Sequence, residues 1–443
     1  MNEKDRKVPR RIAQTVINSL KGGVVPRIGL PYITVGRKNE IEALLHDVDI
    51  IAEGGASFRF IVGRYGSGKS FLLQTIRNYV MDRGFIVADA DLSPERRLQG
   101  TNGQGLATYR ELIGNLSTKT KPEGGALNLL LDRWISSVQS EAVIESGESL
   151  GSPALTALID KKIYAVTSSV SELVHGFEFA KLLSKYYHAY IDGDDETKLK
   201  VVRWFRAEYS LKREAKEELG VNILITDDNW YEYLKLFATF FRLAGYSGLM
   251  IMIDELVNIY KVPNSITRQY NYEKILTIYN DTLQGKAKYF GVIMGATPQA
   301  IEDKRRGVYS YEALRSRLAE GKFSREGARD LLAPVIRLDP LTAEEMLILC
   351  EKLANIHADL YGYKQKITTD ELVGFIKIEY ERVGADLNIT PREVIRDFIE
   401  LLDLLFQNPS MTINEMLNSD EFSYAKSEAV SDEKQENYAE FTI

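Results

Sequence analysis

Residues 63–70 of the chain have the composition and spacing of a phosphate-binding loop. They read GRYGSGKS and match the pattern G-x-x-x-x-G-K-[ST] at every fixed position. Three glycines allow the backbone to fold around a β-phosphate with its N–H groups pointing inward, and the following helix N-terminus favours an anion. The candidate nucleotide-binding residues are Gly63, Arg64, Tyr65, Gly66, Ser67, Gly68, Lys69, Ser70 and Phe71.

Two side chains of this loop have specific expected tasks. Lys69 would reach the β- and γ-phosphates of ATP, and the Ser70 hydroxyl would ligate Mg²⁺. The loop follows an apolar stretch at 58–62 that reads as a strand, and it opens a stretch at 71–80 that reads as a helix. That context is the one the motif requires, although a chance glycine turn between the two elements is the alternative.

A second group of candidates follows the apolar run at 249–253. Asp254 and Glu255 come directly after it. We expect this run to be a central strand beside the strand that leads into the loop, with Asp254 at its carboxyl end, where ligands bind in a parallel sheet. Asp254 would hold magnesium and Glu255 would polarise the attacking water. The alternative is a buried strand followed by an acidic helix start.

A polar residue also ends the next apolar run. Residues 289–298 read as a buried strand that finishes in Gly-Ala-Thr-Pro. Thr297 at its tip is a candidate sensor of the γ-phosphate or of the water. A threonine before proline is also an ordinary strand terminator.

These residues need an α/β framework with a parallel sheet. Strands are predicted at 58–62, 85–92, 248–256 and 289–298, and a helix at 271–283. The stretch 105–245 is mostly helical in pattern. The chain after Pro340 is predicted to be helical, and the glycines and prolines of residues 1–30 indicate a helix followed by a strap.

Composition excludes several classes of protein. The chain has 443 residues, 44% hydrophobic and 27% charged, with a net charge of −7. One cysteine, Cys350, excludes an internal disulfide framework, and with four histidines a structural zinc site is not expected. No secretory signal is visible, and no apolar run approaches the ~20 residues that span a bilayer. We therefore expect a cytoplasmic protein that does not bind membranes.

Several basic stretches are candidates for contact with nucleic acid. They are residues 6–11, Arg96 and Arg97, 198–206 and 304–306. Arg96 and Arg97 lie in a glycine-rich loop after the second strand, where they could grip phosphates. Each stretch is also compatible with an ordinary solvated surface, because acidic residues interleave several of them.

The pattern as a whole resembles AAA+ ATPases, in particular the initiator-like branch related to origin-recognition proteins. Residues 35–40 (VGRKNE) resemble the box near the adenine in that branch, which implies a role for Gly36 and Arg37. Residues 314–318 (LRSRL) resemble the arginine-finger box, with Arg317 slightly favoured over Arg315. Such a finger acts on a neighbouring subunit, so this resemblance implies a homo-oligomer. A solvated basic helix face is the alternative.

Two further resemblances concern the C-terminal part and the family. Residues 390–393 (TPRE) resemble the second sensor, whose arginine would be Arg392, although the same residues are common helix-capping chemistry. Residues 22–41, 57–74 and 390–399 are similar to ATP-binding proteins of bacteriophage-exclusion (BREX) clusters. That similarity spans about 10–110 and 245–405.

The distance along the chain between Lys69 and Asp254 is much longer than a minimal AAA+ core would need. We therefore expect a helical insertion at about 115–240 within a core at 35–340. The core is preceded by a strap at 1–34. It is followed by a helical lid at 341–410 and an acidic tail at 411–443.

The resemblance implies an ATP-hydrolysing oligomeric switch or motor that acts on double-stranded DNA in a phage-defence complex. A helicase, nuclease or methyltransferase would be its partner in that complex. Two rival hypotheses remain open. One is a signalling NTPase of the STAND type, in which nucleotide exchange sets the state. The other is an ATP-bound scaffold or loader that recruits a helicase or nuclease through the insertion.

Overall fold

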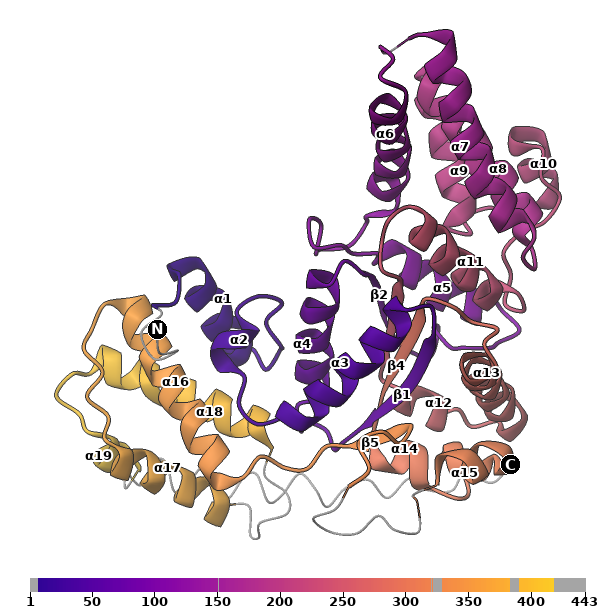
Figure 1. Ribbon diagram of the computed structural model, residues 1–443. Helices are drawn as coiled ribbons and strands as arrows, with labels where there is room; N and C mark the ends of the chain where they lie inside the picture. Colours follow the sequence, from indigo (N-terminus) through magenta and orange to yellow (C-terminus); the bar gives the residue numbers. More distant parts are fainter. Residues whose placement is uncertain (1–6, 150, 320, 322–328, 383–389, 418–443) are drawn as a thin grey trace. The chain divides into compact units, whose positions relative to one another are not determined.

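The computed structural model describes residues 7–149, 151–319, 321, 329–382 and 390–417, which form two compact units. The first unit comprises Met1–Lys38, Arg64–Thr75 and Leu338–Ile443. The second comprises Asn39–Gly63 and Ile76–Arg337 and contains the sheet (Figure 1). The loop that follows Gly63 therefore groups with the N-terminal and C-terminal helices.

The second unit contains a five-stranded sheet in which every described pairing is parallel. The order is β2-β3-β4-β1-β5. The strands are β1 (Ala56–Val62), β2 (Ile86–Asp91), β3 (Leu249–Asp254), β4 (Phe290–Ala296) and β5 (Val335–Arg337). The predicted α/β class with a parallel sheet is confirmed. The short edge strand β5 was not predicted, because three residues carry no readable periodicity.

One expectation about the sheet was wrong. The strand ending at Asp254 does not lie beside the strand that leads into the loop, because β4 pairs with both β1 and β3 and separates them. The apolar runs of buried central strands resemble one another, so they say nothing about lateral order. As a result, the residue after β4, Thr297, lies between the ends of β1 and β3 at the carboxyl edge of the sheet.

Helices cover both faces of the sheet, which explains why its strands are apolar throughout. Phe58 of β1 packs edge-on against Tyr279, with ring centroids 5.6 Å apart. Gly291 of β4 is in register with Ser57, the neighbour of Phe58, so a side chain at Gly291 would lie on the face of the sheet opposite to Phe58. A Cβ at Gly291 would meet Ile51 at 2.7 Å. The helices that carry Tyr279 and Ile51 are α13 (Ser265–Leu283) and α3 (Lys38–Ala52).

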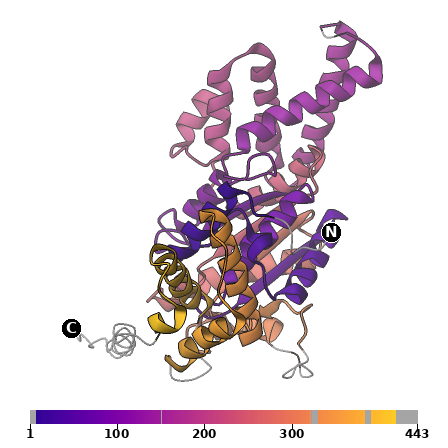
Figure 2. The same ribbon diagram turned by 90° about the vertical axis from the view of Figure 1, so that its left-hand side faces the viewer.

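Among the described residues, seven helices lie between β2 and β3, as the helical pattern of 105–245 predicts. They are α5 (Gln104–Gly114), α6 (Leu127–Ser146), α7 (Pro153–Ser171), α8 (Gly176–Asp192), α9 (Asp195–Phe205), α10 (Lys212–Leu219) and α11 (Trp230–Leu243). In Figures 1 and 2, α6 to α10 lie together, beyond α5 and α11. Aromatic side chains fill their core, and Phe179 contacts Phe205, Phe237 and Phe240.

Short helices follow the strands at the carboxyl edge. They are α12 (Val257–Tyr260) after β3, α14 (Pro298–Glu302) after β4, then the 3₁₀ turn η2 (Val308–Ser310) and α15 (Glu312–Leu318). The helix after the loop is α4 (Lys69–Asp82).

The first unit is helical. Its helices are α1 (Arg10–Lys21), α2 (Leu30–Ile33), α16 (Ala343–Tyr361), α17 (Thr369–Arg382), α18 (Pro391–Gln407) and α19 (Ile413–Leu417). Apolar residues of α1, α16 and α18 share one core, which includes the buried Cys350. A polar chain joins the same three helices: His357 contacts Asp403 at 3.0 Å, and Asp403 pairs with Lys21 at 2.5 Å. Most of the predicted acidic tail, from residue 418, lies outside the described residues.

Among the described residues, no helix is both long enough and apolar enough to cross a bilayer.

Candidate functional site

The glycine loop is closed on itself and leads directly into α4. Gly66 and Gly68 have φ angles of 73° and 91°, a region that glycine enters without a steric penalty. The backbone N–H of Ser67 donates to the carbonyl of Arg64 at 3.2 Å, and that of Leu72 donates to Gly68 at 2.9 Å. The loop therefore has the backbone shape of a phosphate cradle at a helix N-terminus.

Lys69 lies over this loop. Its side chain is only 9% exposed, and Nζ donates to the carbonyl oxygen of Arg64 at 2.8 Å. Nζ also lies 5.5 Å from the ring centroid of Tyr65, which is 53% exposed. A buried ammonium needs an oxygen partner, and a phosphate oxygen can take the place of the carbonyl.

The loop fits the phosphates of ATP in two further respects. The Ser67 hydroxyl is buried and has no hydrogen-bond partner among the described residues, which is costly unless a ligand supplies one. A Cβ at Gly68 would find no atom within 4 Å, so open space lies beside that part of the loop. The residues present are thus suited to a polyanionic ligand.

Residues just after the predicted N-terminal strap lie against the loop in the first unit. Arg37 Nη2 donates to the carbonyl of Ser67 at 3.2 Å and to that of Asp339 at 2.7 Å. Arg37 itself has a φ of 62°, which is uncommon for a residue with a side chain. Gly36 approaches α16 so closely that a Cβ would lie 2.6 Å from a carboxylate oxygen of Glu345.

The start of α18 also lies against the loop. A Cβ on Gly66 would lie 2.6 Å from Cβ of Thr390 and 2.7 Å from its hydroxyl. Thr390 caps α18 in a reciprocal capping box with Glu393. Arg392 is exposed on the first turn of the same helix. The first unit thus brings together the loop, Arg37 and the helix end that carries Arg392.

Asp254 and Glu255 lie at the carboxyl edge of the sheet. The backbone N–H of Glu255 donates to Asp254 Oδ1 at 2.8 Å, and Glu255 has a φ of 61°. The chain turns sharply there, and Leu256 N donates to the carbonyl of Gly295 at 3.2 Å. Strand β1 ends at the same edge, where Gly63 N donates to the carbonyl of Ala296 at 3.0 Å. Gly63 is the first residue of the glycine loop.

Asp91 is a neighbour of Asp254 that sequence reasoning missed. It ends β2 and is the register partner of Asp254, so the two carboxyl groups lie side by side at the sheet edge. Partial withdrawal from water, followed by repulsion from Asp254, raises the pKa of Asp91 above its ordinary value. The available signal was an aspartate at the end of the second predicted strand.

Thr297 caps α14 at the end of β4. Its hydroxyl accepts a hydrogen bond from Ala300 N at 3.3 Å, and the side chain is 8% exposed. The capping role that any threonine before a helix can play is therefore present. A role toward a nucleotide stays a prediction.

Arg315 and Arg317 lie on α15 in the second unit. Arg315 forms an ion pair with Glu312 at 3.8 Å, and Arg317 Nη1 donates to the carbonyl of Ala313 at 2.6 Å. A role toward a neighbouring subunit stays a prediction.

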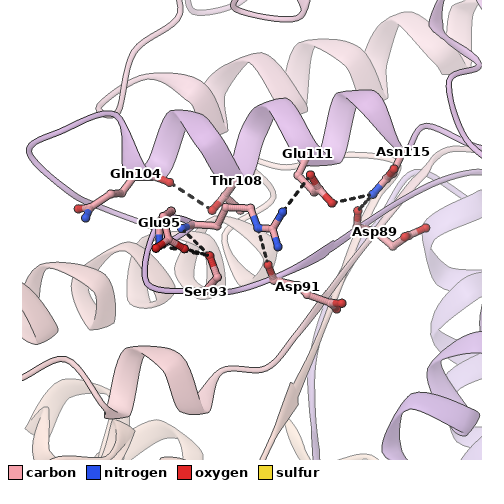
Figure 3. A network of polar contacts seen from close by, with 9 residues as sticks. Asp89, Asp91, Ser93, Glu95, Gln104, Thr108, Glu111 and Asn115 are labelled. Carbon is pink, nitrogen blue, oxygen red and sulfur yellow. Dashed lines mark hydrogen bonds and ion pairs between the residues drawn. The ribbon is translucent and has the colours of Figure 1, made fainter. Parts of the chain in front are cut away.

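The loop after β2 is held by polar contacts with residues of the second unit (Figure 3). Arg96 Nε donates to the carbonyl of Asp91 at 3.0 Å, and its guanidinium pairs with Glu111 at 3.2 Å. Asn115 Nδ2 reaches the carbonyl of Asp89 at 2.9 Å. Arg96 is thus engaged in fastening the loop to α5, which weakens its candidacy as a phosphate contact.

No three His, Cys, Asp or Glu side chains gather as a metal site within the described parts of the chain. Nucleotide-bound magnesium uses only one or two protein ligands beside the phosphates and waters. A role of Ser70 and Asp254 toward magnesium stays a prediction.

The comparisons with known proteins are consistent with this site. A search of curated proteins gave no match. The family model described as BREX system ATP-binding protein BrxC/D matches residues 8–421. That match covers the glycine loop, the strands of the sheet, the helices between β2 and β3 and the C-terminal helices. The chain therefore belongs to the family of BREX system ATP-binding proteins BrxC/D.

Proposed function

We propose that the protein hydrolyses ATP to ADP and phosphate. The observation that carries this is the complete phosphate loop, which follows β1 in the chain, together with Asp254 at the end of β3 and Glu255 directly after it. A loop alone supports binding, whereas the acidic pair supplies the two groups that hydrolysis needs in addition.

The proposed roles follow from the chemistry of each group. The loop N–H groups and Lys69 bind the phosphates, and Gly36 and Arg37 lie on the adenine side. Ser70 and Asp254 are the residues that would hold Mg²⁺, which when bound offsets the phosphate charge. Glu255 orients the attacking water. Thr297 and Arg392 sense the γ-phosphate.

We further propose an AAA+-like oligomeric switch or motor that acts on double-stranded DNA with other defence proteins. Arg317, with Arg315 as the second candidate, would reach the nucleotide of the neighbouring copy. This part is supported by the resemblance of residues 314–318 to an arginine-finger box and by the family's place in BREX systems.

The first test is the steady-state ATPase rate with and without linear duplex DNA. Glu255→Gln should keep ATP binding and lose at least ~100-fold in rate, and Lys69→Ala should lose binding. Negligible turnover in the unaltered protein, with ADP tightly retained, would contradict a motor and favour the STAND-type switch. Mass in solution with ATP tests the oligomer, and a strict monomer under every nucleotide condition contradicts it.

A scaffold is the second candidate, because the inserted helices expose apolar side chains. Val174, in the turn between α7 and α8, is 66% exposed, and Phe177, in the first turn of α8, is 68% exposed. On this view, Val174→Ser with Phe177→Ser should weaken capture of a helicase or nuclease encoded with the protein. ATP binding should be unchanged.

A further inference from the structure

Three exposed cations lie on two turns at the carboxyl edge of the sheet. Lys261 follows α12, and Lys304 and Arg305 follow α14. We call these three residues the basic patch. None of them forms an ion pair with a carboxylate of a described residue, whereas Lys162, Lys200, Arg203 and Arg213 on the helices between β2 and β3 do.

The two turns are joined by specific contacts, so the cations have a fixed base. Tyr260 Oη donates to Asp303 Oδ2 at 3.0 Å. Arg306 Nη2 donates to the carbonyl of Tyr260 at 3.3 Å, and its guanidinium lies 5.3 Å from the Tyr260 ring centroid. These bonds connect the residues immediately next to Lys261 and Lys304 and hold the patch together.

The nearest carboxylate, Asp303, carries one negative charge and so offsets only part of the charge of the three cations of the patch. Asp303 Oδ1 accepts from the backbone N–H of Arg305 at 2.7 Å and of Arg306 at 3.2 Å. The hydrogen bond from the Arg305 N–H is the largest of the interactions that lower the pKa of Asp303. The Asp303 carboxyl group therefore stays ionised and anchors the turn.

A buried arginine adds to the positive field below the patch. Arg268 Nη1 donates to the carbonyls of Val262 and Pro263 at 2.6 and 2.9 Å, within the turn that carries Lys261. The turns thus concentrate positive charge on a chain whose net charge is −7. A protein of this sign can bind a polyanion only through such a local surface.

We propose that the basic patch binds the phosphate backbone of DNA. Exposed lysines are flexible point charges and suit a repeating row of phosphates. The inference deepens the proposed DNA-acting ATPase by assigning its DNA contact. One short helix, α12, separates Glu255 from Lys261, and another, α14, separates Thr297 from Lys304. DNA on the patch would therefore act on the residues proposed to handle water and γ-phosphate.

The test is binding of a fluorescently labelled DNA duplex to full-length protein, followed by polarisation. Lys261→Glu, Lys304→Glu and Arg305→Glu are combined in the patch variant. A control variant carries Lys161→Glu, Lys364→Glu and Lys366→Glu, at exposed sites on other elements, so that net charge is matched. The patch variant should bind at least ~10-fold more weakly than the control and have a salt slope smaller by ~3.

Several outcomes would overturn the assignment. Equal affinity of the two variants would show that DNA, if bound, lies elsewhere. Displacement of duplex by a poly-glutamate peptide at equal charge concentration would assign the surface to an acidic protein. Binding of a labelled single strand tests whether single-stranded and duplex DNA share the contact. Tighter binding of either form still supports a site for backbone phosphates.

ATPase measurements separate this inference from the proposed reaction. The patch variant should keep the basal rate of the unaltered protein and lose only its stimulation by DNA. If the unaltered protein binds duplex through the patch but hydrolyses no ATP, the proposed reaction fails and the patch stands.

Discussion

At the residue scale, two polar side chains of the glycine loop differ in their hydrogen bonding. Lys69 holds the carbonyl of Arg64, whereas the Ser67 hydroxyl has no partner among the described residues. Glu255 is in a left-handed conformation that costs about 1–3 kcal/mol for a residue with a side chain. Such strain is commonly retained where a side chain must point in one direction for function.

The pair Asp91 and Asp254 leads to a prediction about pH. Because the folded protein raises the pKa of Asp91, ionising it destabilises the fold. This cost is absent below about pH 3.9, the ordinary value for aspartate, grows as pH rises from there to the folded-state pKa, and is constant above it. Asp91→Asn should therefore raise the melting midpoint at pH 7 and leave it unchanged near pH 3.5.

The measurement is thermal unfolding across that pH range. Asp49→Asn serves as the control, because Asp49 is an exposed carboxylate paired with Arg83 at 2.6 Å, and its loss should not stabilise the protein at neutral pH. A stabilisation by Asp91→Asn that is independent of pH would exclude carboxylate repulsion as the cause.

At the element scale, helix ends and strand ends position the candidate groups. The capping box of α18 places Thr390 against the loop, and the ends of β3 and β4 place Asp254 and Thr297 at one edge. Arg77 of α4 is buried and donates to Asp89, Ser117 and the carbonyl of Pro122. The helix after the loop is thereby fastened to β2 and to the segment that enters the inserted helices.

The close approach of α18 to the loop predicts the effect of a single methyl group. Gly66→Ala should weaken ATP binding at least ~10-fold, because its Cβ would overlap Thr390 and its φ of 73° is strained for alanine. Isothermal titration with ATP measures this.

Gly103→Ala is the matched control for that substitution. It has the same kind of strain, at a φ of 76°, and no atom within 4 Å of its new Cβ. Equal losses of ATP affinity in both variants would mean that strain or global stability, and not the contact with Thr390, explains the effect.

At the scale of the whole molecule, the proposed arginine finger predicts that one subunit needs Arg317 of its neighbour for hydrolysis. Arg317→Ala should bind ATP normally and lose about 10³-fold in rate, the lower end of what an arginine finger contributes. Glu255→Gln should also be inactive. Mixing the two inactive proteins should restore activity, because a site with Glu255 from one copy can receive Arg317 from the next.

The measurement is the ATPase rate of the mixture against the summed rates of the separate variants. The control mixture combines Lys69→Ala with Glu255→Gln. No restoration is expected there if Lys69 and Glu255 belong to the same active site, because neither copy then has a complete one. Absence of restoration in the first mixture, with oligomers demonstrably mixed, would contradict the finger.

Much of this organisation could be predicted from contiguous residues. The loop at 63–70, the acidic pair after 249–253, the helical character of 105–245 and the helices after Pro340 are local patterns. Neighbouring residues determine glycine conformations, helix periodicity and apolar runs, so these features can be read along the chain. The same locality explains why family membership was recognisable from short motifs.

Only the tertiary structure decided which separated segments meet. It placed β4 between β1 and β3, added β5, set Asp91 against Asp254, and brought Arg37 and Thr390 to the loop. It also joined the turns that carry Lys261 and Lys304. Strand order and register depend on pairings between residues far apart in the chain, whose energies come from burial and packing that no local pattern encodes.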